Sequence, residues 1–198
     1  MERRAVADIR KVLDTAGWID GEEAKRYTRD FRDDFGGPAV GVARPGNTQD
    51  VSAVVTICAR DGLAVVAQGG NSSLSGGSVP HASKPTVILS LERMRNIETV
   101  NAHQFTMTVE AGVTIEAIQD AAAAVERLFA PDWGARGTAT IGGAIATNAG
   151  GINVLRYGMT REHVLGVEVV LADGQIWNGL RALPKDNSGY DLKNVHRQ

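Results

Sequence analysis

Apolar residues recur at helical spacing in three segments of the chain. The spacing predicts helices over residues 5–16, 48–61 and 115–125. Thr48 and Thr114 stand just before the apolar positions of the second and third helices, and Gly62 follows the second. A threonine hydroxyl at such a place accepts a hydrogen bond from a free backbone N–H. We therefore expect both threonines to be N-caps and Gly62 to end its helix.

Strands are predicted between these helices by short apolar runs and by alternation of apolar and polar residues. They cover residues 39–43, 64–67, 86–91, 105–109 and 164–171, and Asp173-Gly174 supplies a hairpin turn after the last. Helices and strands in this order predict an α+β fold made of two α/β subdomains. We expect a helical lead-in, a first subdomain and a second subdomain, at residues 1–35, 36–85 and 86–198.

The composition is that of an ordinary globular protein, with 43% hydrophobic residues, 22% charged residues and a net charge of −2. So small a charge gives no reason to expect a nucleic-acid partner. Cys58 is the single cysteine, which excludes an intrachain disulfide and a thiolate metal site. No apolar run approaches the roughly 20 residues that cross a bilayer, and the first residues lack the apolar core of a secretory signal. We therefore expect a cytoplasmic protein with no transmembrane segment.

Glycines are concentrated in two stretches, the first of which follows the strand predicted at residues 64–67. It reads Gln68-Gly-Gly-Asn-Ser-Ser-Leu-Ser-Gly-Gly-Ser78. Glycines let a backbone approach a ligand with no Cβ in between, and successive N–H groups can form a concavity that binds anions. Diphosphate suits this chemistry best, and a long surface turn is the alternative. The stretch is neither a GxGxxG dinucleotide loop nor a Walker loop, since no Gly-Lys-Ser/Thr ends it.

The second stretch runs from Pro131 to Gly151 and includes a small-residue segment at residues 143–149, predicted to form one or two helical turns. Small side chains let a flat ligand lie against the backbone, and a helix N-terminus at Gly142-Gly143 favours negative charge. The alternative is tight packing of a helix on a sheet. Two such loops together predict a cradle for a large dinucleotide, in one cleft between the subdomains.

Several motifs occur in a fixed order along the chain. They are Arg44-Pro45, Gln68–Gly77, Val109-Glu-Ala-Gly-Val113, Thr140-Ile-Gly-Gly143, Thr147-Asn-Ala-Gly-Gly151, Tyr157-Gly158, Val164–Gly174 and Lys185–Lys193. This order resembles the FAD-binding domain (PCMH type) of the vanillyl-alcohol-oxidase superfamily. Within that superfamily it is most similar to the D-2-hydroxyglutarate, D-lactate and glycolate dehydrogenases. The resemblance extends from about residue 27 to residue 193.

The resemblance implies FAD as the cofactor and gives residues of both loops a role. The first loop would hold the FAD diphosphate and approach the isoalloxazine ring, through Gly69, Gly70, Asn71, Ser72, Ser73, Gly76 and Gly77. The other side of the cofactor would be lined by Pro131, Asp132, Gly134, Ala135, Thr140, Gly142 and Gly143. The ribityl and flavin portion would be followed by Ala146, Thr147, Asn148, Gly150 and Gly151. Covalent members attach the flavin through a histidine at the position of Ser72, so a serine there implies non-covalent FAD.

The resemblance also implies an activity, the oxidation of a D-2-hydroxy acid to a 2-oxo acid by hydride transfer to flavin N5. An external electron acceptor would then reoxidise the flavin. In the family, the arginine and the metal-binding histidines of the substrate site lie in a domain that follows these motifs, and His196 lies outside them. We therefore expect this chain to lack the catalytic groups and a metal site, to hold FAD weakly or not at all, and to expose apolar surface that favours self-association.

Two other functions stay open at this point. One is a non-catalytic FAD- or nucleotide-binding module or subunit that another chain completes. The other is an oxidase of the same superfamily that acts on an alcohol or a sugar.

Other residues with chemical potential have simpler explanations. His81 and His103 stand in polar turns, where solvation accounts for them, and a structural hydrogen bond is the expectation for His163. Trp133 either covers the core or stacks near the cofactor, and we favour the core. Cys58 lies on the apolar face of its helix and is expected in the core.

Overall fold

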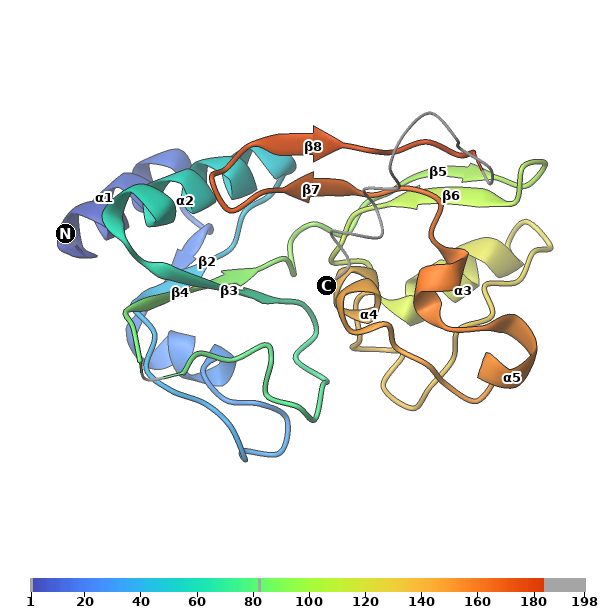
Figure 1. Ribbon diagram of the computed structural model, residues 1–198, viewed down its shortest axis with the longest axis horizontal. Coiled ribbons are helices and arrows are strands. Elements are labelled where there is room, and N and C mark those ends of the chain that lie inside the picture. The colour runs from blue at the N-terminus through green and yellow to red at the C-terminus, as the bar shows by residue number, and fades with distance from the viewer. Residues whose placement is uncertain (1, 82, 184–198) are drawn as a thin grey trace. The chain divides into compact units, whose positions relative to one another are not determined.

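The computed structural model describes residues 2–81 and 83–183, which form two compact units (Figure 1). Of the described residues, unit 1 contains those up to Met94 together with Val170–Ile176, and unit 2 contains Arg95–Val169 and those from Trp177 to Leu183. The sequence motif at residues 185–193 and His196 lie outside the described residues. No helix in the described part of the chain is both long enough and apolar enough to cross a membrane.

The division into units differs from the expected boundaries at residues 36–85 and 86–198. The strand expected to open the second subdomain, residues 86–91, pairs instead with strands of unit 1. The pattern of predicted helices and strands changes near this strand, which suggested a boundary there. Strand pairing, however, is decided by partners that are distant in the chain.

Unit 1 is built on a four-stranded sheet. Its elements are α1 (Glu2–Val12), β1 (Trp18–Ile19), η1 (Gly21–Tyr27), β2 (Gly41–Ala43), α2 (Thr48–Asp61), β3 (Ala64–Gln68) and β4 (Thr86–Ser90). The sheet has the order β1-β2-β4-β3, in which β2, β4 and β3 are parallel and β1 is antiparallel to β2. The succession β2–α2–β3 confirms the predicted strand–helix–strand unit.

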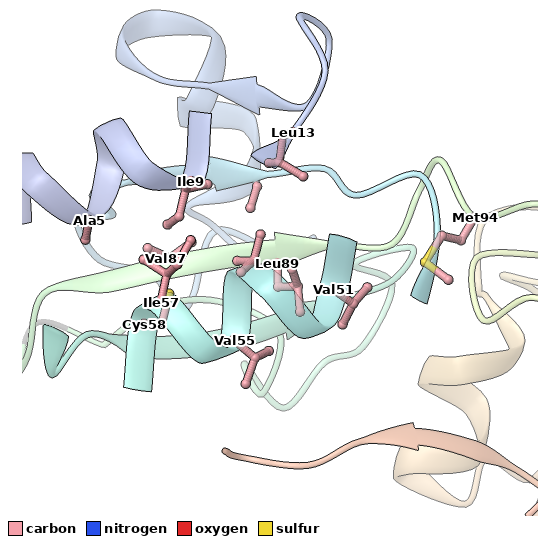
Figure 2. Packing of buried hydrophobic residues seen from close by; sticks show 12 residues of the cluster. Ala5, Ile9, Leu13, Val51, Val55, Ile57, Cys58, Val87, Leu89 and Met94 are labelled. Carbon is pink, nitrogen blue, oxygen red and sulfur yellow. The ribbon is translucent and has the colours of Figure 1, made fainter. Parts of the chain in front are cut away.

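Both faces of this sheet are covered. Helices α1 and α2 pack side by side over one face, against Val87 and Leu89 of β4 (Figure 2). The intervening Ile88 packs on the other face with Tyr27 of η1 and Val42 of β2. Successive strand residues point to opposite faces, so a strand covered on both sides can be apolar throughout.

Helix α2 begins and ends where local signals place its ends. Asn47 is the N-cap, because its side chain accepts a hydrogen bond from the backbone N–H of Asp50 at 2.9 Å. Thr48, predicted as the cap, is instead the first helical residue. Gly62 ends the helix with φ of 70°, as predicted. Cys58 is fully buried on the inner face, where burial raises the pKa of its thiol to about 11, so it is a core side chain as predicted.

The tip of the last hairpin belongs to unit 1. Strands β7 (Glu168–Val170) and β8 (Ile176–Asn178) form a two-stranded sheet, with the predicted turn at Gly174. The carbonyl oxygen of Gly174 accepts a hydrogen bond from Ser52 Oγ of α2 at 2.5 Å. Gly174 is buried with φ of 88°, and a Cβ there would overlap Thr56 Oγ1. The hairpin tip is therefore held against α2 at a position where only glycine fits.

Unit 2 contains a second core. Its elements are β5 (Ile97–Asn101), β6 (Thr106–Val109), α3 (Ile115–Ala123), α4 (Ile141–Thr147), α5 (Val154–Tyr157) and η2 (Thr160–His163). Its buried apolar residues are Val113, Ile115, Ile118, Ala139, Ile141 and Ala144. Thr114 caps α3 as predicted, with its hydroxyl oxygen 3.2 Å from the backbone N–H of Ala117. Helices and strands in both units confirm the predicted α+β class.

Two features of unit 2 differ from the expectation. Strand β5 was not signalled by the sequence, yet it pairs antiparallel with β6. Phe105, predicted on the buried side of a strand, lies before β6 with φ of 55° and is 76% exposed. The Arg127 guanidinium covers its ring, 4.7 Å from the centroid. The predicted strand therefore begins one residue later than expected, at Thr106.

The hairpin tip gives a stability prediction. Gly174→Ala adds left-handed strain and overlap with Thr56, so we expect unfolding free energy to fall by about 3 kcal/mol. Gly62→Ala is the matched control, because φ is 70° but the added Cβ meets nothing, and about 1 kcal/mol is expected. Urea unfolding followed by circular dichroism measures both. Equal losses for the two variants would show that the tip does not depend on its contact with α2.

Candidate functional site

The first glycine loop starts at the carboxyl end of β3, and its first side chain fixes both of its ends. Gln68 is 2% exposed. Its Nε2 donates to the carbonyl oxygen of Tyr27 at 2.9 Å and to that of Ser78 at 2.7 Å. In parallel sheets, ligands commonly bind beyond the carboxyl ends of the strands. The loop therefore stands where a binding loop is expected, with its base closed by a buried amide.

The polar side chains of this loop mostly bond within the protein. Asn71 has φ of 49°, and its Nδ2 donates to the carbonyl oxygen of Arg29 at 2.7 Å. Its Oδ1 accepts from Ser78 Oγ at 2.6 Å. Ser73 and Ser75 share a hydrogen bond of 2.9 Å between their hydroxyls. Asn71, predicted to contact the cofactor, thus has its side chain engaged in shaping the loop.

The backbone N–H groups of the loop, unlike its side chains, have few partners within the described residues. Within residues 2–81 and 83–183, no acceptor is found for the backbone N–H groups of residues 69–74. Residues 69–73 are half-buried. Unpaired N–H donors are costly unless water or a ligand satisfies them. A run of consecutive free donors suits an anion with several oxygens, and diphosphate is such an anion.

The second loop is anchored in unit 2 at both of its ends. The carbonyl oxygen of Pro131 accepts from Gln119 Nε2 at 2.9 Å. The carbonyl oxygen of Asp132 accepts from the backbone N–H of Ile152 at 3.1 Å. Gly151 has φ of 150°, and a Cβ there would overlap that Asp132 carbonyl. Asp132 and Gly151, both predicted site residues, therefore lie directly against each other.

The start of α4 corrects the expectation of an anion site at Gly142-Gly143. The helix begins at Ile141, whose N–H donates to the carbonyl oxygen of Val113 at 2.9 Å. The N–H of Gly142 donates to the carbonyl oxygen of Ala111, also at 2.9 Å. Two of the first amides are therefore taken by the segment on which the helix packs.

The glycines of the second loop fall into two groups. Gly142 and Gly150 are packing positions, because an added Cβ would lie 2.8 Å from the Ala111 Cβ and 3.2 Å from the Met159 sulfur, respectively. For these two glycines the tight-packing alternative is supported. Gly134 has open space around an added Cβ, and at Gly143 the nearest atom would be 3.5 Å away. Packing does not explain these two, so they are the better candidates for a close approach of a ligand.

Thr140, just before α4, has a buried hydroxyl group. It is 6% exposed, and its Oγ1 has no hydrogen-bond partner among the described residues. A buried hydroxyl without a partner costs roughly 1–3 kcal/mol. The added Cβ of Gly143 would lie 3.5 Å from this same hydroxyl, so the unsatisfied hydroxyl and an uncrowded glycine are neighbours.

The rest of the predicted set surrounds the end of α4. Thr147 Oγ1 donates to the Gly143 carbonyl within its own helix at 2.9 Å. Asn148 ends the helix with φ of 48°, and its Oδ1 accepts from the Arg161 N–H at 3.0 Å. The Arg161 guanidinium donates to the carbonyls of Ile145 and Ala146 at 2.9 and 2.8 Å. A positive charge at a helix C-terminus is stabilising, so Arg161, which the sequence did not single out, fixes this helix.

Other candidates behave as follows. His81 and His103 are exposed, and Trp133 packs against the core of unit 2, as predicted. The Nε2 of His163 is buried and has no hydrogen-bond partner in the described part of the chain. The His163 ring packs edge-on against the Phe129 ring, with centroids 5.9 Å apart. Among residues 2–81 and 83–183, no three His, Cys, Asp or Glu side chains gather as metal ligands.

Comparison with known proteins identifies the domain. The family described as FAD binding domain matches residues 39–179, which include both glycine loops. The chain belongs to this FAD-binding domain family. FAD is therefore its cofactor, and the residues described above fit it: free backbone donors for a diphosphate, uncrowded glycines, and an unpaired buried hydroxyl.

Relatives of this FAD-binding domain include two D-2-hydroxyglutarate dehydrogenases. The protein of Xanthomonas citri pv. viticola is 41% identical over 173 residues, which cover 87% of this chain and 36% of the relative. The mitochondrial protein of Bos taurus is 38% identical over 190 residues, which cover 96% of this chain and 35% of the relative. The chain thus spans about a third of the length of the curated relatives it matches.

Solved structures share the fold at low sequence identity. An alkyldihydroxyacetonephosphate synthase has a TM-score of 0.85 at 17% identity, over 98% of this chain and 37% of that chain. A 4-ethylphenol oxidase from Gulosibacter chungangensis has a TM-score of 0.76 at 23% identity, over 98% of this chain and 39% of that chain. These likenesses confirm the predicted α+β fold class.

The anchoring of the second loop can be tested at Gly151. Gly151→Ala forces a Cβ onto the Asp132 carbonyl, which belongs to the backbone and cannot rotate away, so a loss of about 3 kcal/mol in unfolding free energy is expected. Gly134→Ala, in the same loop with open space around it, should change stability by less than about 0.5 kcal/mol. Denaturant unfolding compares them. A harmless Gly151→Ala would mean that the loop is not held at this point.

Proposed function

We propose that this FAD-binding domain is the cofactor-binding part of a flavin-dependent oxidoreductase that oxidises a D-2-hydroxy acid to a 2-oxo acid. The observation that carries the proposal is the run of N–H groups at residues 69–74, at the carboxyl end of β3, for which the described part of the chain offers no acceptor. The substrate class is suggested by relatives that are 41% and 38% identical and are named D-2-hydroxyglutarate dehydrogenases.

The first loop would receive the FAD diphosphate. Its backbone N–H groups supply donors without a side chain in the way, and no lysine or arginine stands between Gly69 and Ser78. Binding through neutral amides keeps the site specific for the shape of a diphosphate, because the donors sit at fixed positions on a loop whose base is closed by Gln68. Asn71 would act indirectly, by holding the loop in shape.

The second loop would follow the flavin and ribityl portion of the same FAD molecule. Gly134 and Gly143 would let the cofactor come close to the backbone, and the Thr140 hydroxyl would gain the hydrogen-bond partner that it lacks. Gly142, Gly150 and Gly151 would contribute by packing the loop rather than by contact. We propose that both loops bind this one FAD molecule.

The bound flavin would accept the substrate C2 hydrogen as a hydride at N5. The residues of this chain would hold the flavin in place, while the group that binds the substrate carboxylate and the base that takes the hydroxyl proton are not assigned to this chain. We further propose an external electron acceptor. We also propose a cytoplasmic location, although the Bos taurus relative is named as mitochondrial.

Attachment of the cofactor is the first test. Ser72 cannot form the bond that a flavin-linked histidine makes, so FAD should be bound non-covalently. The FAD-loaded protein is precipitated with acid, and flavin fluorescence is measured in the supernatant and the pellet. We expect all flavin in the supernatant. Flavin that migrates with the denatured polypeptide in a gel would contradict the proposal.

Activity is the second test. The 198-residue chain is assayed with FAD, D-2-hydroxyglutarate or D-lactate, and an artificial electron acceptor. We expect FAD binding that is weak and no turnover, because no carboxylate anchor and base are assigned here and transition-state stabilisation requires them. The protein made from the complete gene should oxidise the D isomer, with the L isomer as the matched control.

The outcomes separate the candidate functions. Turnover by the 198-residue chain would show that its own residues carry the catalytic groups. FAD binding without turnover by the complete protein would favour the alternative, a non-catalytic FAD-binding module or a subunit that another chain completes.

A further inference from the structure

A short turn preceding β2 is more tightly organised than its polar sequence suggests. The N–H of Asp30 donates to the Phe35 carbonyl at 3.1 Å, and the N–H of Phe35 donates back to Asp30 Oδ1 at 2.8 Å. Asp30 is 6% exposed although its side chain is a polar carboxyl group. Arg29 and Gly36 form an antiparallel bridge across the turn. We call residues 27–37 the support turn; it lies before residue 39, where the family match begins.

The support turn contacts the first glycine loop at its beginning, its middle and its end. The Tyr27 carbonyl accepts from Gln68, and the Arg29 carbonyl accepts from Asn71. At the end of the loop, Gly76 is buried with φ of 69°, and the Phe35 ring occupies the space beside it. A Cβ on Gly76 would lie only 2.5 Å from Phe35 Cγ.

These contacts divide the loop into a bonded part and a free part. The side chains of Gln68 and Asn71 donate to carbonyl oxygens of the support turn, and the N–H groups of residues 69–74 have no partner among the described residues. A loop rich in glycine loses much conformational freedom when it is ordered. Contacts that order it before the ligand arrives reduce the cost of binding.

We propose that the support turn is a positioning element for the FAD diphosphate, and that Phe35 is its main positioning residue. The proposal rests on the proposed function. The turn would hold residues 69–77 in the conformation that keeps their N–H groups available, so removing the Phe35 ring would leave the loop present but mobile. Phe35 touches the loop and is 41% exposed, so its replacement leaves the two hydrophobic cores intact.

The first experiment needs no ligand. Heteronuclear ¹⁵N–¹H NOE values are measured for the amides of residues 69–77 in the unmodified chain and in Phe35→Ala. We expect lower values in Phe35→Ala and partial recovery in Phe35→Leu. Phe31→Ala is the matched control, because Phe31 lies in the same turn and is 76% exposed, and it should change nothing. Asn71→Gly tests a second contact while keeping a backbone that tolerates φ of 49°, and it should also lower the values. An unchanged loop in Phe35→Ala and Asn71→Gly would overturn the proposal.

The second experiment asks whether the diphosphate is what the loop senses. Affinities for FAD, ADP and riboflavin are measured by calorimetry. If the ordered loop falls to about a tenth of the population, Phe35→Ala should weaken FAD and ADP about tenfold. Riboflavin has no diphosphate and should change less than about twofold. Equal weakening of riboflavin would overturn the positioning role. An unmodified chain that binds neither FAD nor ADP would agree with the weak affinity expected of these 198 residues, and the NOE comparison would then decide whether the turn orders the loop. The proposed function itself is tested separately, by the activity assay.

Discussion

Strand β4 lies between β2 and β3, although it follows both of them in the chain. All of its residues, Thr86–Ser90, are buried, so the helices on one face and η1 on the other both depend on it. Because β3 and β4 are parallel, the connection between them must return from one end of the sheet to the other. The glycine loop is the first part of this return, which places its free backbone donors at the carboxyl edge of the strands.

A polar loop at this edge has to be stable without using the groups that bind the ligand. In this loop, side chains make the hydrogen bonds that hold it in place, and the backbone N–H groups do not take part. Gln68 and Asn71 bond to carbonyl oxygens of the protein, whereas the N–H groups of residues 69–74 stay unbonded within the described residues. The same distinction separates the glycines of the second loop, where Gly142 serves packing and Gly134 has open space around it.

The comparisons with known proteins distinguish the fold of this domain from the reaction in which it takes part. The fold is shared with a synthase and with an oxidase of a phenol, at 17% and 23% identity, so the fold by itself does not specify a reaction. Relatives at 41% and 38% identity are named D-2-hydroxyglutarate dehydrogenases, and this chain spans about a third of their length. The described residues fit the binding of FAD and leave the reaction unassigned.

The sequence by itself determined the features that depend on neighbouring residues. These are the α+β class, the end of α2 at Gly62, the cap of α3 at Thr114, the turn at Gly174 and the position of both glycine loops. Only the tertiary structure decided the pairing of β4 in unit 1, the strand β5, the exposure of Phe105 and the contact between Phe35 and Gly76. Caps and turns are fixed by hydrogen bonds within a few residues, so composition and spacing reveal them. Strand order, and the difference between a glycine that packs and one that leaves space, depend on atoms far away in the chain, which no local pattern contains.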